Sequence, residues 1–208
     1  MKSLLAITSF LILLAASLSA AERFPKLDDT DWGWWRGPNH NGIAAASAQP
    51  PLTWDDNTNI RWQAEIPGRG HSSPTVVGDR VFLTTANEVK QTQHVLCFDR
   101  STGDVLWNKE IYQGNFDHNN NKNSFASSSV SCDGQQIYTS FFRDKKILTV
   151  ALTLKGKLVW EHVYGGFASH QGFGASPLLY KRMVILAADN KADGGGLLTA
   201  INRQNGDI

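Results

Sequence analysis

The feature that most constrains this chain is an internal repeat of about fifty residues. When the sequence is shifted by 103 positions, Ser73 falls on Ser176 and Gly103 falls on Gly206. A middle copy lies between these two, because Gly156 matches Gly103 at a shift of 53. A repeat of this length is a single supersecondary unit that cannot bury its apolar face alone, so neighbouring copies must stack on one another.

Each copy consists of short segments that favour β-strands. In the first copy, residues 75–77 and 81–85 flank Gly78-Asp79, a pair of residues typical of a tight hairpin turn. Residues 94–99 predict a third strand, and residues 105–110 predict a fourth. Beyond the apolar N-terminal run, no long stretch has the 3.6-residue apolar period of an amphipathic helix, so we expect few helices.

Four strands per unit at this period are typical of the blades of a β-propeller. A β-sandwich also contains many short strands but does not repeat at this length, and a β-helix repeats at a much shorter period. We therefore expect an all-β protein, a partial β-propeller of about three four-stranded blades. The expected units are an N-terminal extension at 22–58 and a propeller at 59–208, with blades at 69–111, 123–164 and 170–208.

The two ends of the repeat array indicate an open ring. Residues 59–66 match residues 104–111 at a shift of 45, so the pattern of an outer strand occurs before any blade has begun. In a closed propeller such a strand completes the last blade. The sequence stops at Ile208, before the fourth strand of the third blade, and closed rings contain about four to eight blades. We therefore expect a fragment, truncated before ring closure.

The N-terminus has the layout of a secretory signal peptide. Lys2 provides a positive start, residues 4–14 form an apolar run, and small side chains precede Glu22. The run is too short to span a bilayer as a stable helix, although a membrane anchor is the alternative interpretation. We expect residues 1–21 to be removed by cleavage after Ala21, which leaves a mature protein without a membrane span in the periplasm or outside the cell.

The composition narrows the range of partners. Without Lys2, the Lys and Arg residues of the mature chain equal its 19 Asp and Glu residues in number, and no basic patch predicts a nucleic-acid partner. Only Cys97 and Cys132 are present, so a hydrophobic core rather than a disulfide framework must hold the fold. Ala151 and Ala200 occupy the repeat position of Cys97, which indicates two separate buried thiols; a disulfide in an oxidising compartment is the alternative.

Residues 97–107, CFDRSTGDVLW, resemble the tryptophan-docking motif A-x-D-x-x-T-G-x-x-x-W of pyrroloquinoline quinone dehydrogenases and their non-enzymatic relatives. The middle copy is one residue shorter and has Thr153 in place of the motif's Asp, and the third copy has Asn202 there. Residues 32–38, WGWWRGP, are similar to a segment that precedes many exported propellers of this kind. The resemblance implies structural repeat residues at Trp62, Asp99, Gly103, Trp107, Gly156, Trp160 and Gly206.

Several polar residues lie in or near the segments that enter the first strand of each blade. In a propeller the first strands line a central channel, and the loops that enter them crowd one of its mouths. We expect a shared ligand-binding funnel formed by Arg69, His71, Lys122, Asn123, His170 and Gln171. The histidines lack metal-ligand spacing and no nucleophile motif accompanies them, so neither a metal site nor catalytic residues are assigned.

The shared residues are packing residues, which specify a fold better than a function. We expect a non-catalytic binding or scaffolding module of the cell envelope, with an envelope protein or a small-molecule or polymer ligand as partner and no evident cofactor. The alternative is a quinoprotein alcohol or sugar dehydrogenase that uses pyrroloquinoline quinone and calcium. Against it, the chain lacks the adjacent cysteines frequent in those enzymes, and no set of oxygen ligands matches calcium. Another propeller enzyme acting on carbohydrate or polymer is the third class.

Overall fold

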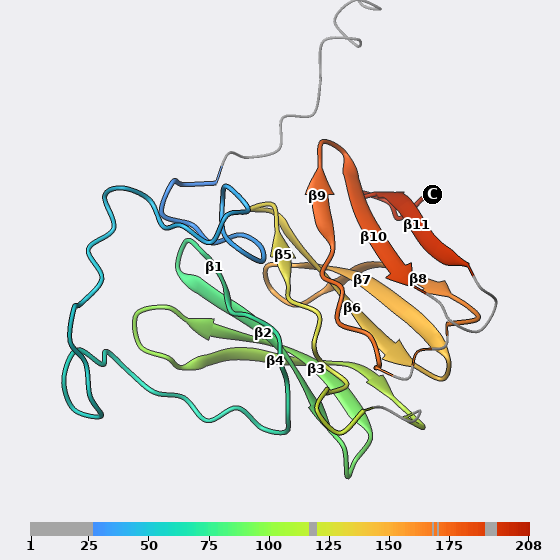
Figure 1. Cartoon of the computed structure of the whole chain (residues 1–208), viewed down its shortest axis with the longest axis horizontal. Coiled ribbons are helices and arrows are strands. Elements are labelled where there is room, and N and C mark those ends of the chain that lie inside the picture. Colours follow the sequence, from blue (N-terminus) through green and yellow to red (C-terminus); the bar gives the residue numbers. More distant parts are fainter. Residues whose placement is uncertain (1–26, 117–119, 168, 170, 190–194) are drawn as a thin grey trace, which may run out of the picture.

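The computed structural model describes residues 27–116, 120–167, 169, 171–189 and 195–208. This part of the chain contains three antiparallel sheets and no helix (Figure 1). The first sheet contains β1 (Thr75–Val77), β2 (Arg80–Asn87), β3 (Thr92–Asp99) and β4 (Val105–Gln113). The second contains β5 (Ser131–Cys132), β6 (Gln136–Arg143), β7 (Lys146–Thr153) and β8 (Leu158–Tyr164). The third contains β9 (Leu178–Tyr180), β10 (Met183–Asp189) and β11 (Gly196–Asn202).

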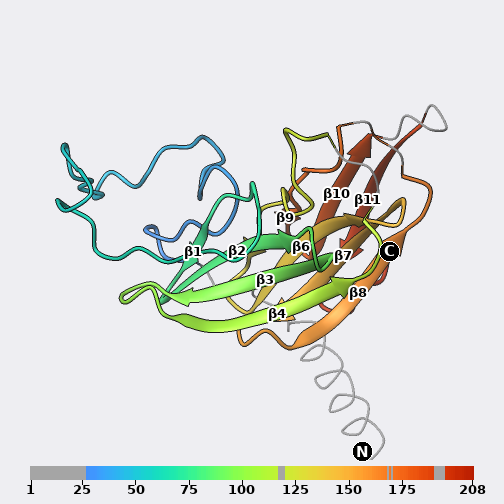
Figure 2. The same cartoon turned by 90° about the horizontal axis from the view of Figure 1, so that it is seen from below.

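The sheets stack face to face in chain order (Figure 2). Alternate residues of β3 explain why, since side chains along a strand point to opposite faces. Val95 and Cys97 belong to the core shared with the second sheet, whereas Leu96 and Phe98 pack on the other face of the first sheet. The central strands are therefore buried on both faces. The all-β partial propeller expected from the repeat is confirmed.

One tryptophan contact recurs at every junction. The indole ring of a preceding segment lies over a turn glycine of the next sheet, and its N–H donates to a backbone carbonyl in the same turn. The three donor–acceptor distances are 2.9 Å from Trp62 to Arg100, 3.1 Å from Trp107 to Leu154 and 2.8 Å from Trp160 to Arg203. Trp160 is buried, Trp62 and Trp107 are half-buried, and each indole obtains the polar partner that it needs. Trp107 and Trp160 thereby hold each sheet against the next.

The turn glycines are required by both backbone and packing. Gly156 has a φ of 76°, and a Cβ atom there would lie 3.0 Å from the ring of Trp107.

We expect Gly156→Ala to lower the free energy of unfolding by about 1–3 kcal/mol, because left-handed backbone disfavours Ala and the indole must move. Urea denaturation measures this change in the free energy of unfolding. Gly78→Ala is the matched control, since its φ is 57° but open space surrounds the added methyl group, so only the backbone penalty applies; equal losses in both variants would contradict the packing role.

The turn before β4 is held by Asp99. Its Oδ1 atom accepts hydrogen bonds from the backbone N–H of Ser101 and Thr102 at 2.8 and 3.0 Å. The hydroxyl of Ser101, followed by these amides, lowers the pKa of the Asp99 carboxyl. Asn202 accepts the N–H of Gln204 at 3.0 Å in the third sheet, so an amide oxygen replaces the carboxylate there.

Residues 59–66, expected to form an outer strand, pair with no strand in the described part of the chain. A strand is defined by hydrogen bonds to a neighbour, and none of the three described sheets supplies one for this segment. The segment still occupies the place of an outer strand. Trp62 and Ala64 pack on the exposed face of the first sheet, and Gln63 between them is exposed.

The described part of the N-terminal extension lies against the first strands of two sheets. Trp32 and Val76 exchange two backbone hydrogen bonds of 2.7 and 3.0 Å, and the carbonyl of Gly33 accepts the N–H of Cys132 at 2.7 Å. Asp31, which is 5% exposed, accepts the N–H of Gly78 at 2.9 Å. The expected signal peptide at 1–21 lies outside the described residues. Within the described ranges there is no helix long and apolar enough to cross a membrane.

Candidate functional site at the strand-entry loops

The loops that enter the first strands of the three sheets touch one another. The guanidinium of Arg69 donates to the carbonyl of Asn121 at 2.7 Å and lies 3.6 Å from the carboxylate of Glu88. Its backbone exchanges two hydrogen bonds with Ala86 of β2, which fixes the start of the side chain. Arg69 therefore joins the loop of the first sheet to the loop of the second.

A second set of contacts joins the second and third sheets. The side-chain amide of Asn123 donates to the carbonyl of Gln171 at 2.6 Å. The amide of Asn120 donates to the side-chain oxygen of Gln171 at 3.2 Å. The oxygen of Asn123 in turn accepts the N–H of Ser124 at 2.8 Å. We call this continuous surface, formed by Arg69, His71, Asn120, Asn121, Lys122, Asn123 and Gln171, the entry rim.

The residues predicted for the funnel occupy different positions on the entry rim. Arg69, Asn123 and Gln171 take part in the contacts between loops. His71 is exposed, and its backbone N–H donates to the carbonyl of Ala126 at 3.0 Å. Lys122 is also exposed. His170 lies outside the described residues. A ligand-binding role for these side chains remains a prediction.

Sequence reasoning missed a serine ladder directly beneath the entry rim. The backbone N–H of Ser73 donates to the hydroxyl of Ser129 at 2.8 Å, and the N–H of Ser129 donates to the hydroxyl of Ser176 at 2.9 Å. Thr75 adds a bond from its hydroxyl to the carbonyl of Val130 at 2.6 Å. Ser73 and Ser176 already coincide in the repeat, which was the available signal. The ladder fixes the spacing between the inner edges of the three sheets.

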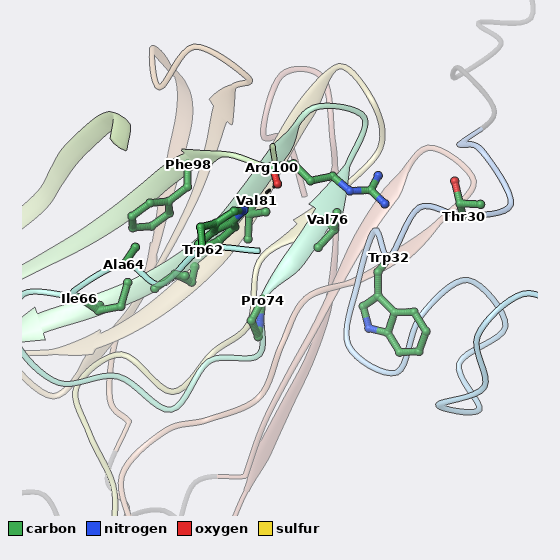
Figure 3. A pocket seen from close by; sticks show the side chains of 11 residues that line it. Thr30, Trp32, Trp62, Ala64, Ile66, Pro74, Val76, Val81, Phe98 and Arg100 are labelled. Carbon is green, nitrogen blue, oxygen red and sulfur yellow. Dashed lines mark hydrogen bonds between the residues drawn. The ribbon is translucent and has the colours of Figure 1, made fainter. Parts of the chain in front are cut away.

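A separate apolar groove lies on the outer face of the first sheet (Figure 3). Its volume is about 570 Å³, with Trp62, Ala64 and Phe98 at one end and Trp32 at the other. Arg100 borders the groove and donates to the carbonyl of Gly78 at 3.2 Å. The groove offers hydrophobic contact area but no cluster of titratable groups, so it is a packing surface rather than a centre for chemistry.

Two deeply buried charged groups join the second and third sheets. Asp133 and Arg203 are 5% and 6% exposed, and their charged atoms lie 3.5 Å apart. The hydroxyl of Tyr138 donates to Asp133 at 2.9 Å. Burial lowers the pKa of Arg203, and Asp133 opposes that shift. Burial, followed by the charge of Asp133, raises the pKa of Tyr138. The arrangement is an ion pair that fastens two sheets.

Both cysteines are free and fully buried. Burial raises the pKa of Cys97 and of Cys132 to about 12. In the unfolded chain a thiol ionises near about pH 8.5, so above that pH the unfolded state binds fewer protons than the folded state. The contribution of the two thiols to stability is therefore fully present below about pH 8.5. As the pH rises from there towards 12, the free energy of unfolding falls by about 1.4 kcal/mol per pH unit for each thiol.

Urea denaturation between pH 8 and 10.5 measures this loss. The double variant Cys97→Ala, Cys132→Ala should show a clearly weaker pH dependence, because only Tyr and Lys groups then titrate in this range. Ala already occupies the position of Cys97 in the other two copies of the repeat. The same slope in the wild-type chain and in the double variant would show that the thiols are not buried as described.

Among the described residues, no group of three or more His, Cys, Asp or Glu side chains is arranged to hold a metal ion.

None of the curated proteins compared matches the chain. Among solved structures, a europium-containing methanol dehydrogenase is 19% identical, with a TM-score of 0.48, over 67% of this chain and 24% of that protein. BamB from Moraxella catarrhalis is 14% identical, with a TM-score of 0.44, over 71% of this chain and 53% of that protein. The chain thus spans about a quarter and about half of these two proteins.

A family model gives the assignment. The model described as outer membrane protein assembly factor BamB matches residues 26–168 and again residues 91–208. The two matches overlap, as expected when one repeat unit recurs along the chain. The sheets that they cover are the three stacked sheets with docked tryptophans described above. The chain belongs to this family of pyrroloquinoline-quinone-like β-propeller repeats.

Proposed function

We propose that the chain is a non-catalytic binding module of the bacterial cell envelope, which holds a segment of an envelope protein at the entry rim. The observation that carries this proposal is the match to a family described as an outer membrane protein assembly factor, over most of the chain. The entry rim is its most suitable contact surface. It exposes a cation at Arg69, another at Lys122 and the amide side chain of Gln171, which can hydrogen-bond a polypeptide backbone.

The entry rim is also held in place before binding. The serine ladder and the loop contacts fix its backbone, so little conformational entropy is lost when a partner docks. Arg69 links two loops, and 42% of its side chain remains accessible. We expect its guanidinium to contribute to partner binding through charge-assisted hydrogen bonds.

Site-specific photocrosslinking in cells tests the proposal. A photoreactive amino acid at His71, on the entry rim, should give one discrete adduct with an envelope protein, and Arg69→Ala should reduce that adduct. The same probe at Val105, which is 56% exposed at the start of β4 and lies at the opposite end of the first sheet, is the control and should give none. Equal adducts at both positions, or no effect of Arg69→Ala, would contradict a binding role for the entry rim.

Titration with pyrroloquinoline quinone and calcium separates this function from a quinoprotein dehydrogenase. We expect no saturable change in absorbance and no substrate-dependent dye reduction. Saturable binding with dye reduction would assign the enzymatic function instead.

Export is tested independently by N-terminal sequencing of protein recovered from the periplasm. The expected first residue is Glu22, and recovery of the intact N-terminus in the cytoplasm would contradict export.

A further inference from the structure

A pocket of about 420 Å³ lies at the other end of β5 and β9 from the entry rim. Part of its lining comes from the N-terminal extension, drawn in blue in Figure 1, with Trp34 and Pro38. The entry rim precedes β5 and β9 in the chain, whereas the pocket is bordered by the turns that follow these strands, at Asp133 and Lys181. The pocket and the entry rim are therefore separate surfaces.

The rim of the pocket is polar and open to solvent. Asp28, Asp29, Asn39 and Lys181 line it, and all four residues are exposed. A segment of chain that covered Asp28, Asp29 and Lys181 would take three charges out of water, which is costly unless each charge is paired. The rim is therefore suited to a ligand with many hydrogen-bonding groups rather than to another sheet.

Contacts within the chain hold the interior of the pocket in place. Asp133 and Arg203 contribute to the lining, and their opposite charges lie 3.5 Å apart, so together they present no net charge. The ring of Trp34 stacks on His40, with centroids 5.2 Å apart and planes 13° apart. The indole N–H of Trp34 is buried and has no hydrogen-bond partner among the described residues. Because buried donors are nearly always paired, this N–H favours an acceptor supplied by a bound ligand.

The chemistry of the lining matches the two sides of a sugar ring. Apolar side chains that can pack on the C–H groups of such a ring come from Leu27, Trp34, Pro38 and Leu179. The carboxylate of Asp28 accepts hydrogen bonds from hydroxyl groups, and the amide of Asn39 both accepts and donates them. An anionic ligand would be repelled by the carboxylates of the rim, and a cationic ligand by Lys181. The volume lies within the range of about 300–1,000 Å³ for small-molecule sites.

We propose that this pocket binds a neutral sugar. The C–H face of the sugar packs on the apolar part of the lining, its hydroxyl groups bond to Asp28 and Asn39, and one of its oxygens accepts the indole N–H of Trp34. Since the pocket and the entry rim do not share a residue, sugar binding and partner binding at the entry rim succeed or fail independently.

Isothermal titration calorimetry with glucose, galactose and N-acetylglucosamine tests for binding, and we expect at least one of these sugars to bind saturably. The double variant Asp28→Ala, Asn39→Ala should raise the Kd of that sugar by at least about tenfold, because hydrogen bonds at the rim are lost. The matched control is Asp56→Ala, Asn57→Ala, which removes the same two residue types at exposed positions outside the pocket and should leave the Kd unchanged.

NMR of the indole N–H groups locates the bound sugar. The Trp34 signal, assigned by its absence in Trp34→Phe, should shift when the sugar is added, whereas the signal of the exposed Trp54 should not. No saturable binding of any of the three sugars, equal Kd values for the two double variants, or an unmoved Trp34 signal at saturation would overturn the proposal. Saturable binding of methylammonium in place of the sugars would also overturn it, because the pocket would then select cations.

Discussion

Asp133→Ala should lower the free energy of unfolding by about 3–5 kcal/mol, because it removes a buried carboxylate that lies 3.5 Å from the buried guanidinium of Arg203. The carboxylate of Asp133 accepts the hydroxyl of Tyr138 at 2.9 Å and the N–H groups of Gln135 and Gln136 at 2.9 and 2.7 Å. All of these groups lose an acceptor in the variant. Urea denaturation followed by Trp fluorescence measures the loss.

Asp79→Ala provides the matched control for that experiment. Asp79 also pairs with an arginine, at 2.7 Å from Arg80, but its side chain is 71% exposed. An exposed pair contributes about 0–1 kcal/mol, so this variant should remain close to the wild type. If Asp133→Ala were no more harmful than Asp79→Ala, the ion pair between the second and third sheets would not be buried in solution.

Trp160→Ala should lower the free energy of unfolding by about 3–5 kcal/mol, the usual loss for a large aromatic core residue. Trp160 is 7% exposed, its ring lies over Gly206 and beside Tyr138, and its N–H donates to the carbonyl of Arg203. Removal of the indole leaves a cavity between two sheets and takes one hydrogen-bond donor from the carbonyl of Arg203. Urea denaturation of the purified variant gives the value.

Two further variants separate size from hydrogen bonding. Trp160→Phe keeps an aromatic ring and removes the N–H donor, so a smaller loss of about 1–3 kcal/mol is expected. Trp54→Ala removes an indole that is 69% exposed and should change stability by less than about 0.5 kcal/mol. Similar losses for Trp160→Ala and Trp54→Ala would contradict the docked position of Trp160.

The strand content and the sheets could be predicted because the repeat places a hairpin turn, a turn glycine and a tryptophan at fixed spacing in successive copies. The packed face of residues 59–66 follows the same pattern, since Trp62 matches Trp107. Residues 59–66 have no ladder among the described residues, in agreement with the open ring that the two ends of the repeat predict.

The contacts specific to one copy were not predictable, because they break the repeat. The position of Asp133 is filled by Val77 in the first copy, and the position of Tyr138 is filled by Phe82. No periodic signal therefore marked the buried ion pair with Arg203. The pairing of Trp32 with Val76 was also hidden, since it joins a non-repeating segment to a strand far along the chain. On the entry rim, the residue types were visible, but the contact of Asn123 with Gln171 depends on loop lengths that differ between copies.

Hydrogen exchange of the indole N–H groups, followed by NMR, most directly tests the stacking of the sheets through docked tryptophans. The indole protons of Trp107 and Trp160 should exchange far more slowly than those of the exposed Trp35 and Trp54, because each is bonded to a carbonyl of the next sheet. Exchange of Trp107 and Trp160 as fast as that of the exposed indoles would show that the repeat units do not pack as described.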